Sequence, residues 1–228
     1  MALFHDWDGD AAQVEIDRAL SLNPSLVSGH LVAASRHASL AEHDQALRRL
    51  DTAARLDPLS PGVGSKHCWA LFLARRFDEA GVRCNAVLEL DEHFLPALDN
   101  LKWILTLAGR DAEAAAAFAR LVRLEGEPLE AEQAARERYA SQGLRGLHRL
   151  SLGGLSERAA QGYQSGYDFA LEHVALGETE PALDRLEAAC AERENNLVFL
   201  AVDPRLDPLR DTPRFRDLVR RVGIPPSR

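Results

Sequence analysis

A chain of 228 residues, 46% of them hydrophobic and 27% charged, has the composition of an ordinary folded protein. Its formal net charge of −8 argues against a general affinity for nucleic acid, which requires a positive surface. No run approaches the roughly 20 apolar residues that a membrane-spanning helix needs, and residues 1–6 lack the stretches of a signal peptide. Alanine and leucine lead the hydrophobic share, which favours helices along nearly the whole chain.

One alanine position recurs every 34 residues, or at a multiple of 34, through most of the chain. Its members are Ala12, Ala46, Ala80, Ala114 and Ala182, and His148 occupies the remaining position. Four residues further on, a mostly large apolar position follows in the same frame: Ile16, Leu50, Cys84, Phe118, Leu152 and Leu186. Two units then end in Asn23-Pro24 and Asp57-Pro58, where proline stops a helix. This pattern predicts an internal repeat of helix pairs.

The 34-residue period, with the alanine and apolar positions just named, resembles the tetratricopeptide-repeat (TPR) family. The resemblance implies an all-α fold, a right-handed α-solenoid of antiparallel helix pairs with a C-terminal capping helix. It also implies that the repeated alanine lies where two helix backbones approach closely. In this architecture the first helix of each pair lines a concave surface.

Residues 1–26 are expected to form a partial first repeat, with its second helix over 8–22 and the last turn of its first helix at 1–6. Because a half unit exposes an apolar face, we expect the chain to be a piece of a longer parent, or that face to be covered. Three regular units follow over 27–128, divided as 27–60, 61–94 and 95–128.

The 129–162 unit is expected to be degenerate. His148 replaces the repeated alanine, and glycines surround a short second helix: Gly143, Gly146, Gly153 and Gly154. Lys102 and Arg136 are further departures, since a small residue is usual at the eighth position of a unit. These substitutions weaken individual units without breaking the frame.

A further unit is expected over 163–196, followed by a capping segment over 197–228. Residues 213–222 have the spacing of an amphipathic helix that would cover the last unit. This tail, together with residues 6–8, resembles the TPR regions of bacterial multidomain regulators, where such regions follow winged-helix, kinase or nucleotide-cyclase domains.

No catalytic or cofactor-binding motif stands out. Residues 62–66 lack the glycine spacing of a P-loop, and no strand precedes the elbow-like residues 162–166. His30, His37 and His67 occupy packing positions without acidic or cysteine partners at metal spacing. The sequence therefore predicts a protein that is not an enzyme and that has no cofactor and no metal site.

The three cysteines, Cys68, Cys84 and Cys190, cannot all pair and show no short metal spacing. They fill small core positions, as buried free cysteines usually do. We therefore expect free cysteines in a reducing cytoplasm.

A partner-binding site is predicted on the concave side, where Trp69 and Trp103 fall on the ninth position of neighbouring units. The residues expected to flank them are Phe72, Lys66, Asp99, Asn100 and Thr106. Two stacked tryptophans with polar neighbours would make an aromatic platform, because tryptophan is enriched among residues that dominate interface energetics. The alternative is that both rings pack between adjacent first helices and meet no ligand.

The leading hypothesis is a protein-interaction module that binds a peptide or partner protein in its concave groove. The alternative is the regulatory or sensory TPR region of a larger bacterial transcription regulator, kinase or cyclase. Neither hypothesis assigns the partner or the oligomeric state.

Overall fold

The computed structural model describes residues 7–124 and 129–223, and every regular element in these ranges is a helix. The predicted all-α class is therefore confirmed. The elements are α1 (Gly9–Leu22), α2 (Val27–Ser39), α3 (His43–Leu56), α4 (Pro61–Leu73), α5 (Phe77–Leu90), α6 (Leu95–Leu107), α7 (Asp111–Leu124), α8 (Leu129–Ala159), α9 (Gly166–Leu176), α10 (Thr179–Ala191), the 3-10 helices η2 (Asn195–Phe199) and η3 (Pro204–Leu209), and α11 (Pro213–Val222). The helical turn expected at residues 1–6 lies outside the described residues.

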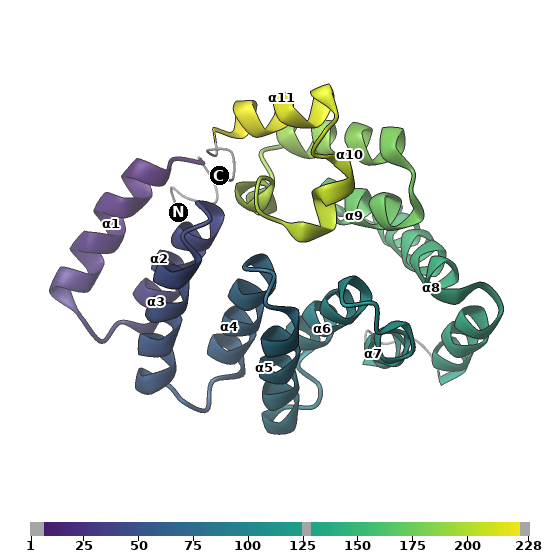
Figure 1. The fold of residues 1–228 in the computed structure, drawn as a ribbon, viewed down its shortest axis with the longest axis horizontal. Coiled ribbons are helices and arrows are strands. Elements are labelled where there is room, and N and C mark those ends of the chain that lie inside the picture. Colours follow the sequence, from purple (N-terminus) through teal and green to yellow (C-terminus); the bar gives the residue numbers. More distant parts are fainter. Residues whose placement is uncertain (1–6, 125–128, 224–228) are drawn as a thin grey trace.

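The helices follow one another as antiparallel pairs along a curved solenoid, and α9 and the C-terminal elements face α4 and α6 across its inside (Figure 1). The repeated alanines explain the tight pairing. Ala46, Ala80, Ala114 and Ala182 each have 0% exposed surface. A larger side chain there would force the two helices of a pair apart.

One residue with positive φ recurs every 34 residues along the described chain. A positive φ recurs at Trp7 (54°), Ala41 (61°), Arg75 (61°), Gly109 (71°), Gly143 (63°) and Gly177 (77°). In four of these turns the amide of the residue after the positive-φ residue donates a hydrogen bond of 2.9 Å to the carbonyl five residues before it, as in Glu42 N–H to His37 O. This bond caps the first helix by satisfying one of its last carbonyls.

The same series accounts for the shape of α8. Its 31 residues are two helices that meet at Gly143, where φ is 63° and ψ is −159°. Gly143 is one of the positive-φ residues that recur every 34 residues. We therefore interpret the break as the turn between two paired helices, and not as a kink within one long helix. Glycine adopts positive φ at little cost, whereas residues such as Ala41 and Arg75 do so under strain.

The tail of the chain was expected to cap the last pair, and α11 does pack on α10. Arg214 of α11 binds three carboxylates of α10, at 2.6 to 2.9 Å: Glu180, Asp184 and Glu187. The preceding η2 and η3 do more than cap, because they lie on the concave side. There Phe199 contacts Trp69 of α4, and Asp207 accepts two hydrogen bonds from Arg75 at 2.5 and 2.7 Å.

The expectation of three free cysteines is wrong for one pair. Cys68 of α4 and Cys84 of α5 form a disulfide, with Cα atoms 5.4 Å apart, whereas Cys190 is free and buried. The two helices of one unit approach closely at these small positions, which brings together residues 16 apart in sequence. Disulfides are typical of oxidising environments, so the pairing removes the basis on which a reducing one was expected. No helix of residues 7–124 and 129–223 is long and apolar enough to span a membrane.

Candidate concave binding groove

The two tryptophans of the predicted site come together around a residue of the chain's own tail. The guanidinium carbon of Arg205 lies 4.9 Å from the ring centroid of Trp69 and 5.4 Å from that of Trp103. Phe72 adds a third aromatic ring at 5.8 Å. A guanidinium over aromatic faces is a favourable cation–π arrangement. In this structure Arg205 therefore lies against the rings of both tryptophans and of Phe72.

A fully buried carboxylate holds Arg205 in place. Asp203, with 0% exposed surface, accepts from Nη2 of Arg205 at 2.6 Å and from the hydroxyl of Tyr167 at 2.7 Å. Burial lowers the pKa of Arg205, but the charge of Asp203 outweighs it and the net pKa is raised. Burial and then Asp203 raise the pKa of Tyr167. Arg205 is thus a permanent cation and Tyr167 a permanent donor.

The tryptophans do not pack simply between first helices, nor do they present open faces. Trp103 is only 5% exposed and stacks on the ring of His148, with centroids 5.2 Å apart. Trp69 is partly buried, and its centroid lies 5.2 Å from that of Phe72 and 5.9 Å from that of Phe199. Both rings therefore help to seat the tail.

Four of the predicted residues, Lys66, Trp69, Asp99 and Asn100, line a small hollow of about 250 Å³ beside Arg205. Phe72 is buried outside it. The hydroxyl of Thr106 donates a hydrogen bond of 2.8 Å to a carbonyl of its own helix, and Thr106 lines neither this hollow nor the larger one described next. These four predicted residues thus lie around one hollow, and the tail residues that also line it were not predicted.

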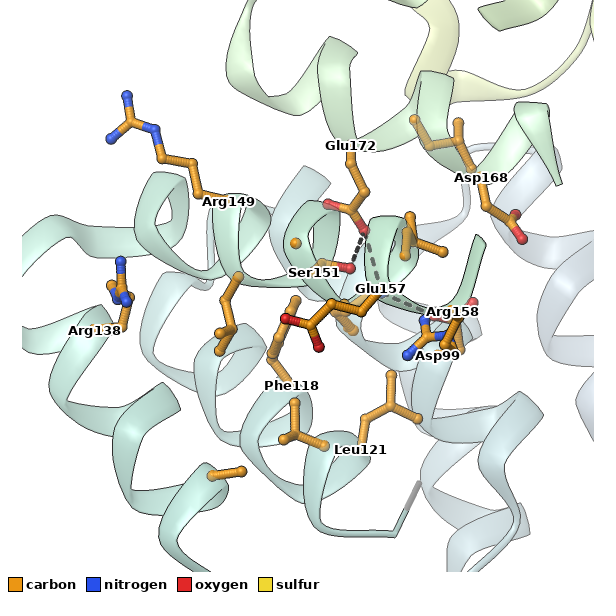
Figure 2. A pocket seen from close by; sticks show the side chains of 18 of the residues that line it. Asp99, Phe118, Leu121, Arg138, Arg149, Ser151, Glu157, Arg158, Asp168 and Glu172 are labelled. Carbon is orange, nitrogen blue, oxygen red and sulfur yellow. Dashed lines mark hydrogen bonds and ion pairs between the residues drawn. The ribbon is translucent and has the colours of Figure 1, made fainter. Parts of the chain in front are cut away.

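A second, larger hollow opens between α6, α7, α8 and α9, and we call it the wide hollow (Figure 2). Its volume is about 590 Å³, within the range of ligand sites. The apolar part of its lining includes Trp103, Phe118, Leu121, Leu155 and Leu171. The polar part comprises Asp99, Lys102, Arg138, Arg149, Ser151, Glu157, Arg158, Asp168, Glu172 and Arg205.

Buried charges at one side of the wide hollow link three helices. Glu172 of α9, 3% exposed, accepts from His148 at 2.7 Å and from Ser151 at 2.8 Å, both on α8. Lys102 of α6, 5% exposed, lies 3.9 Å from Glu172 and 2.9 Å from Asp99. Burial lowers the pKa of Lys102, but Asp99 and Glu172 outweigh it and the net pKa is raised.

Sequence reasoning recorded two members of this network without recognising them. Lys102 and His148 stood out as departures from the repeat, at positions where small residues are usual. They depart together because Glu172 lies between them, 2.7 Å from His148 and 3.9 Å from Lys102. A polar residue at a packing position of a repeat was therefore the available signal for the site.

Asp168 stands apart because its carboxylate has no hydrogen-bond or ion-pair partner among the described residues. The residue is exposed, yet loss of solvent around the carboxylate and the negative charge of Asp99 raise its pKa to about 6. Asp99 differs, because burial raises its pKa but the charge of Lys102 outweighs burial, and the net pKa of Asp99 is lowered.

The remaining polar residues that invite a chemical reading have structural partners. His37 binds Glu42 at 2.6 Å, and His173 binds Glu178 at 2.7 Å at the same positions of another unit. Ser165 is the N-cap of α9. Within residues 7–124 and 129–223, no group of three or more His, Cys, Asp or Glu side chains is placed to hold a metal ion.

No family model and no curated protein sequence matches this chain. Among solved structures it is similar to PilF of Pseudomonas aeruginosa, with 17% identity and a TM-score of 0.54 over 95% of this chain and 91% of that one. It is also similar to a thermophilic TPR protein of Thermus thermophilus, with 16% identity and a TM-score of 0.50 over 92% and 90%. Similarity at this level of identity shows the fold alone. Together with the 34-residue series of turns and alanines, it shows that the chain has the tetratricopeptide-repeat fold.

Proposed function

We propose that this chain is a protein-interaction scaffold that binds a peptide or partner protein in its concave groove. The observation that carries the proposal is the wide hollow, about 590 Å³ of open space between α6, α7, α8 and α9. Its apolar floor and convergent charges are the usual lining of a binding site. Ligand contacts would include Asp99 and Trp103 there, and Lys66, Trp69 and Asn100 in the small hollow.

The polar geometry favours binding over catalysis. Ser151 donates to Glu172 and not to His148, so the hydroxyl that lines the wide hollow is not paired with an imidazole that would activate it. Glu172 in turn is engaged by both residues. The buried charges orient one another, as they would in the wall of a recognition site.

Capture with a photoreactive residue tests the proposal. The residue would replace Arg149, which is exposed and lines the wide hollow, and in a matched control Glu15, which is exposed on α1. We expect the Arg149 position to cross-link one protein from source-cell lysate and the Glu15 position to miss it. Equal cross-linking from both positions, or none from Arg149, would contradict a partner in the groove.

Alanine at both Trp69 and Trp103 would be a poor test of the groove. Trp103 is buried and both rings contact Arg205, so the double variant removes packing as well as any contact surface. Truncation of a buried tryptophan costs about 3–5 kcal/mol. Loss of binding in that variant would therefore not separate recognition from folding.

A further inference from the structure

We infer that η2 and η3, residues 195–209, form an autoinhibitory strap across the concave groove, and that the ion pair between Arg75 and Asp207 is the latch that keeps it closed. The inference rests on the proposed function and names how access to the groove is regulated. Opening the strap separates Phe199 from Trp69 of α4 and widens the small hollow that both residues line.

The strap is held firmly on the side of α9. The Asp203 carboxylate, which has no exposed surface, accepts a hydrogen bond of 2.7 Å from the hydroxyl of Tyr167. Glu194, just before η2, accepts hydrogen bonds of 2.6 and 3.2 Å from the first two backbone amides of α9. Separating buried polar groups from their partners is costly. When the groove opens, the strap therefore stays with α9.

On the side of α4 the strap is held by fewer polar contacts. Among the described residues, the two hydrogen bonds from Arg75 to Asp207 are the only ones that join residues 195–223 to residues 7–124. The two side chains are 49% and 37% exposed, so water and salt reach the pair. Phe199 and Arg205 add contacts with the aromatic rings of α4. The strap therefore separates more easily from α4 than from α9.

The packing between the strap and α4 is also incomplete. The small hollow of about 250 Å³ is lined by residues of α4 and α6 and, from the strap, by Asn196, Phe199 and Arg205. Side chains that border a void have fewer van der Waals partners than side chains in a close-packed core. Less contact is therefore lost when the strap opens at this place.

The backbone of Arg75 is an independent indication that the latch is functional. Arg75 has a φ of 61° at the position of the 34-residue series where Gly109, Gly143 and Gly177 stand. Glycine adopts this conformation at little cost, whereas arginine does so under strain. The guanidinium that arginine supplies binds both carboxylate oxygens of Asp207, at 2.5 and 2.7 Å. Strained residues cluster at clamps and switches.

An exposed ion pair gives a latch that is adjustable. Such a pair shifts an equilibrium by about two- to fivefold, and by less as salt is raised. A partner segment that runs from the wide hollow to Trp69 takes the place of Phe199 against that ring. Its apparent affinity is reduced to the extent that the strap is closed, because only the open fraction of molecules is competent to bind.

The rate of thiol labelling at position 199 measures opening of the strap without any partner. In a Phe199→Cys background the new thiol replaces a side chain that is 5% exposed and contacts Trp69, so it reacts when the strap opens. Cys190 of α10, which is free and buried, reports on opening elsewhere in the same molecule. Circular dichroism would verify that each variant is folded.

We expect Arg75→Gln to raise the labelling rate at position 199 by about two- to fivefold, and high salt to raise the rate of the unchanged latch towards the same value. Arg75→Lys, which keeps the charge, should restore most of the slow labelling. The matched control is Arg76→Gln, because Arg76 binds Glu79 at 2.6 Å with similar exposure, and this change should leave the rate unaltered. Arg75→Gly should also raise the rate, but without lowering stability in urea, because glycine relieves the strained φ.

The outcomes separate the latch from the function on which it rests. Equal labelling of Arg75→Gln and Arg76→Gln at position 199, or labelling that quickens as much at Cys190, overturns the latch whether or not a partner is known. The protein captured through position 149 should bind Arg75→Gln more tightly, by the factor that labelling gives. Unchanged affinity beside faster labelling overturns the autoinhibitory role. Capture of no protein overturns the proposed function and that role with it, whereas the labelling rates still decide on the latch.

Discussion

Replacing Arg205 with methionine should weaken the packing of the C-terminal tail against the groove. Methionine keeps much of the apolar bulk but removes the guanidinium that binds Asp203 at 2.6 and 3.0 Å. Asp203 has no exposed surface, and its remaining side-chain partners are the Tyr167 hydroxyl and one backbone amide. A buried carboxylate that loses its cation costs about 3–5 kcal/mol, and we expect the free energy of unfolding to fall by that amount.

A double-mutant cycle with Asp203→Asn distinguishes the contribution of the ion pair from that of packing. Asp203→Asn removes the buried charge, so Asp203→Asn together with Arg205→Met should be clearly more stable than the sum of the single changes predicts. Urea denaturation followed by far-ultraviolet circular dichroism measures each free energy. A loss below about 1 kcal/mol for Arg205→Met, or additive effects in the double variant, would refute the reasoning that this pair holds the tail.

Three further results are expected. Ala41→Gly should stabilise the fold by up to about 1 kcal/mol in denaturation, and Gly109→Ala should cost about 1–2 kcal/mol, because both residues have positive φ and a Cβ on Gly109 would meet no atom. The carboxyl of Asp168 should titrate near pH 6 by NMR. Since its folded pKa is raised from 3.8, the wild type should lose stability relative to Asp168→Asn as pH rises from about 4 through about 6, and the opposite trend would contradict the shift. Reducing Cys68–Cys84 should lower the free energy of unfolding by about 3 kcal/mol, and thiol counting under denaturing conditions should give one free thiol before reduction and three after.

The helix pairs could be predicted because the two helices of each pair pack against each other in the same way. Alanine at the close approach and an apolar residue one helical turn later leave a mark every 34 residues. The turns were harder to see. Gly109 and Gly177 mark two of them, but the same positive φ at Ala41 and Arg75 has no residue signature. Tertiary packing imposes that conformation against local preference.

The path of the tail could not be predicted from pattern. Amphipathic spacing shows that a helix buries one face, as α11 does, but not which surface receives it. The seating of Arg205 depends on Asp203, Tyr167 and the two tryptophans, which are spread over more than 130 residues. The Cys68–Cys84 pairing was missed for a related reason, since it requires the spacing of two helices and not the spacing of two cysteines along the chain.

The site was half visible. Lys66, Trp69, Asp99 and Asn100 were predicted because first helices of the repeat line the concave side, and all four line the small hollow. The wide hollow was not found, because it depends on the bend of α8 at Gly143 and on its bare Gly153 wall. Gly153 and Gly154, two of the glycines that were expected to weaken the 129–162 unit, thus form part of the wall of the wide hollow.

The central claim is tested most directly with the partner that is captured by cross-linking at position 149. Its affinity is measured for the wild type, for Gly153→Leu and for the control Glu15→Gln. The added leucine enters the wide hollow without meeting another atom at its Cβ, so the fold should be retained, as circular dichroism would verify. If the wide hollow is where the partner binds, Gly153→Leu should weaken binding by about tenfold or more. Unchanged affinity in the folded variant would contradict the account and place the partner on another face.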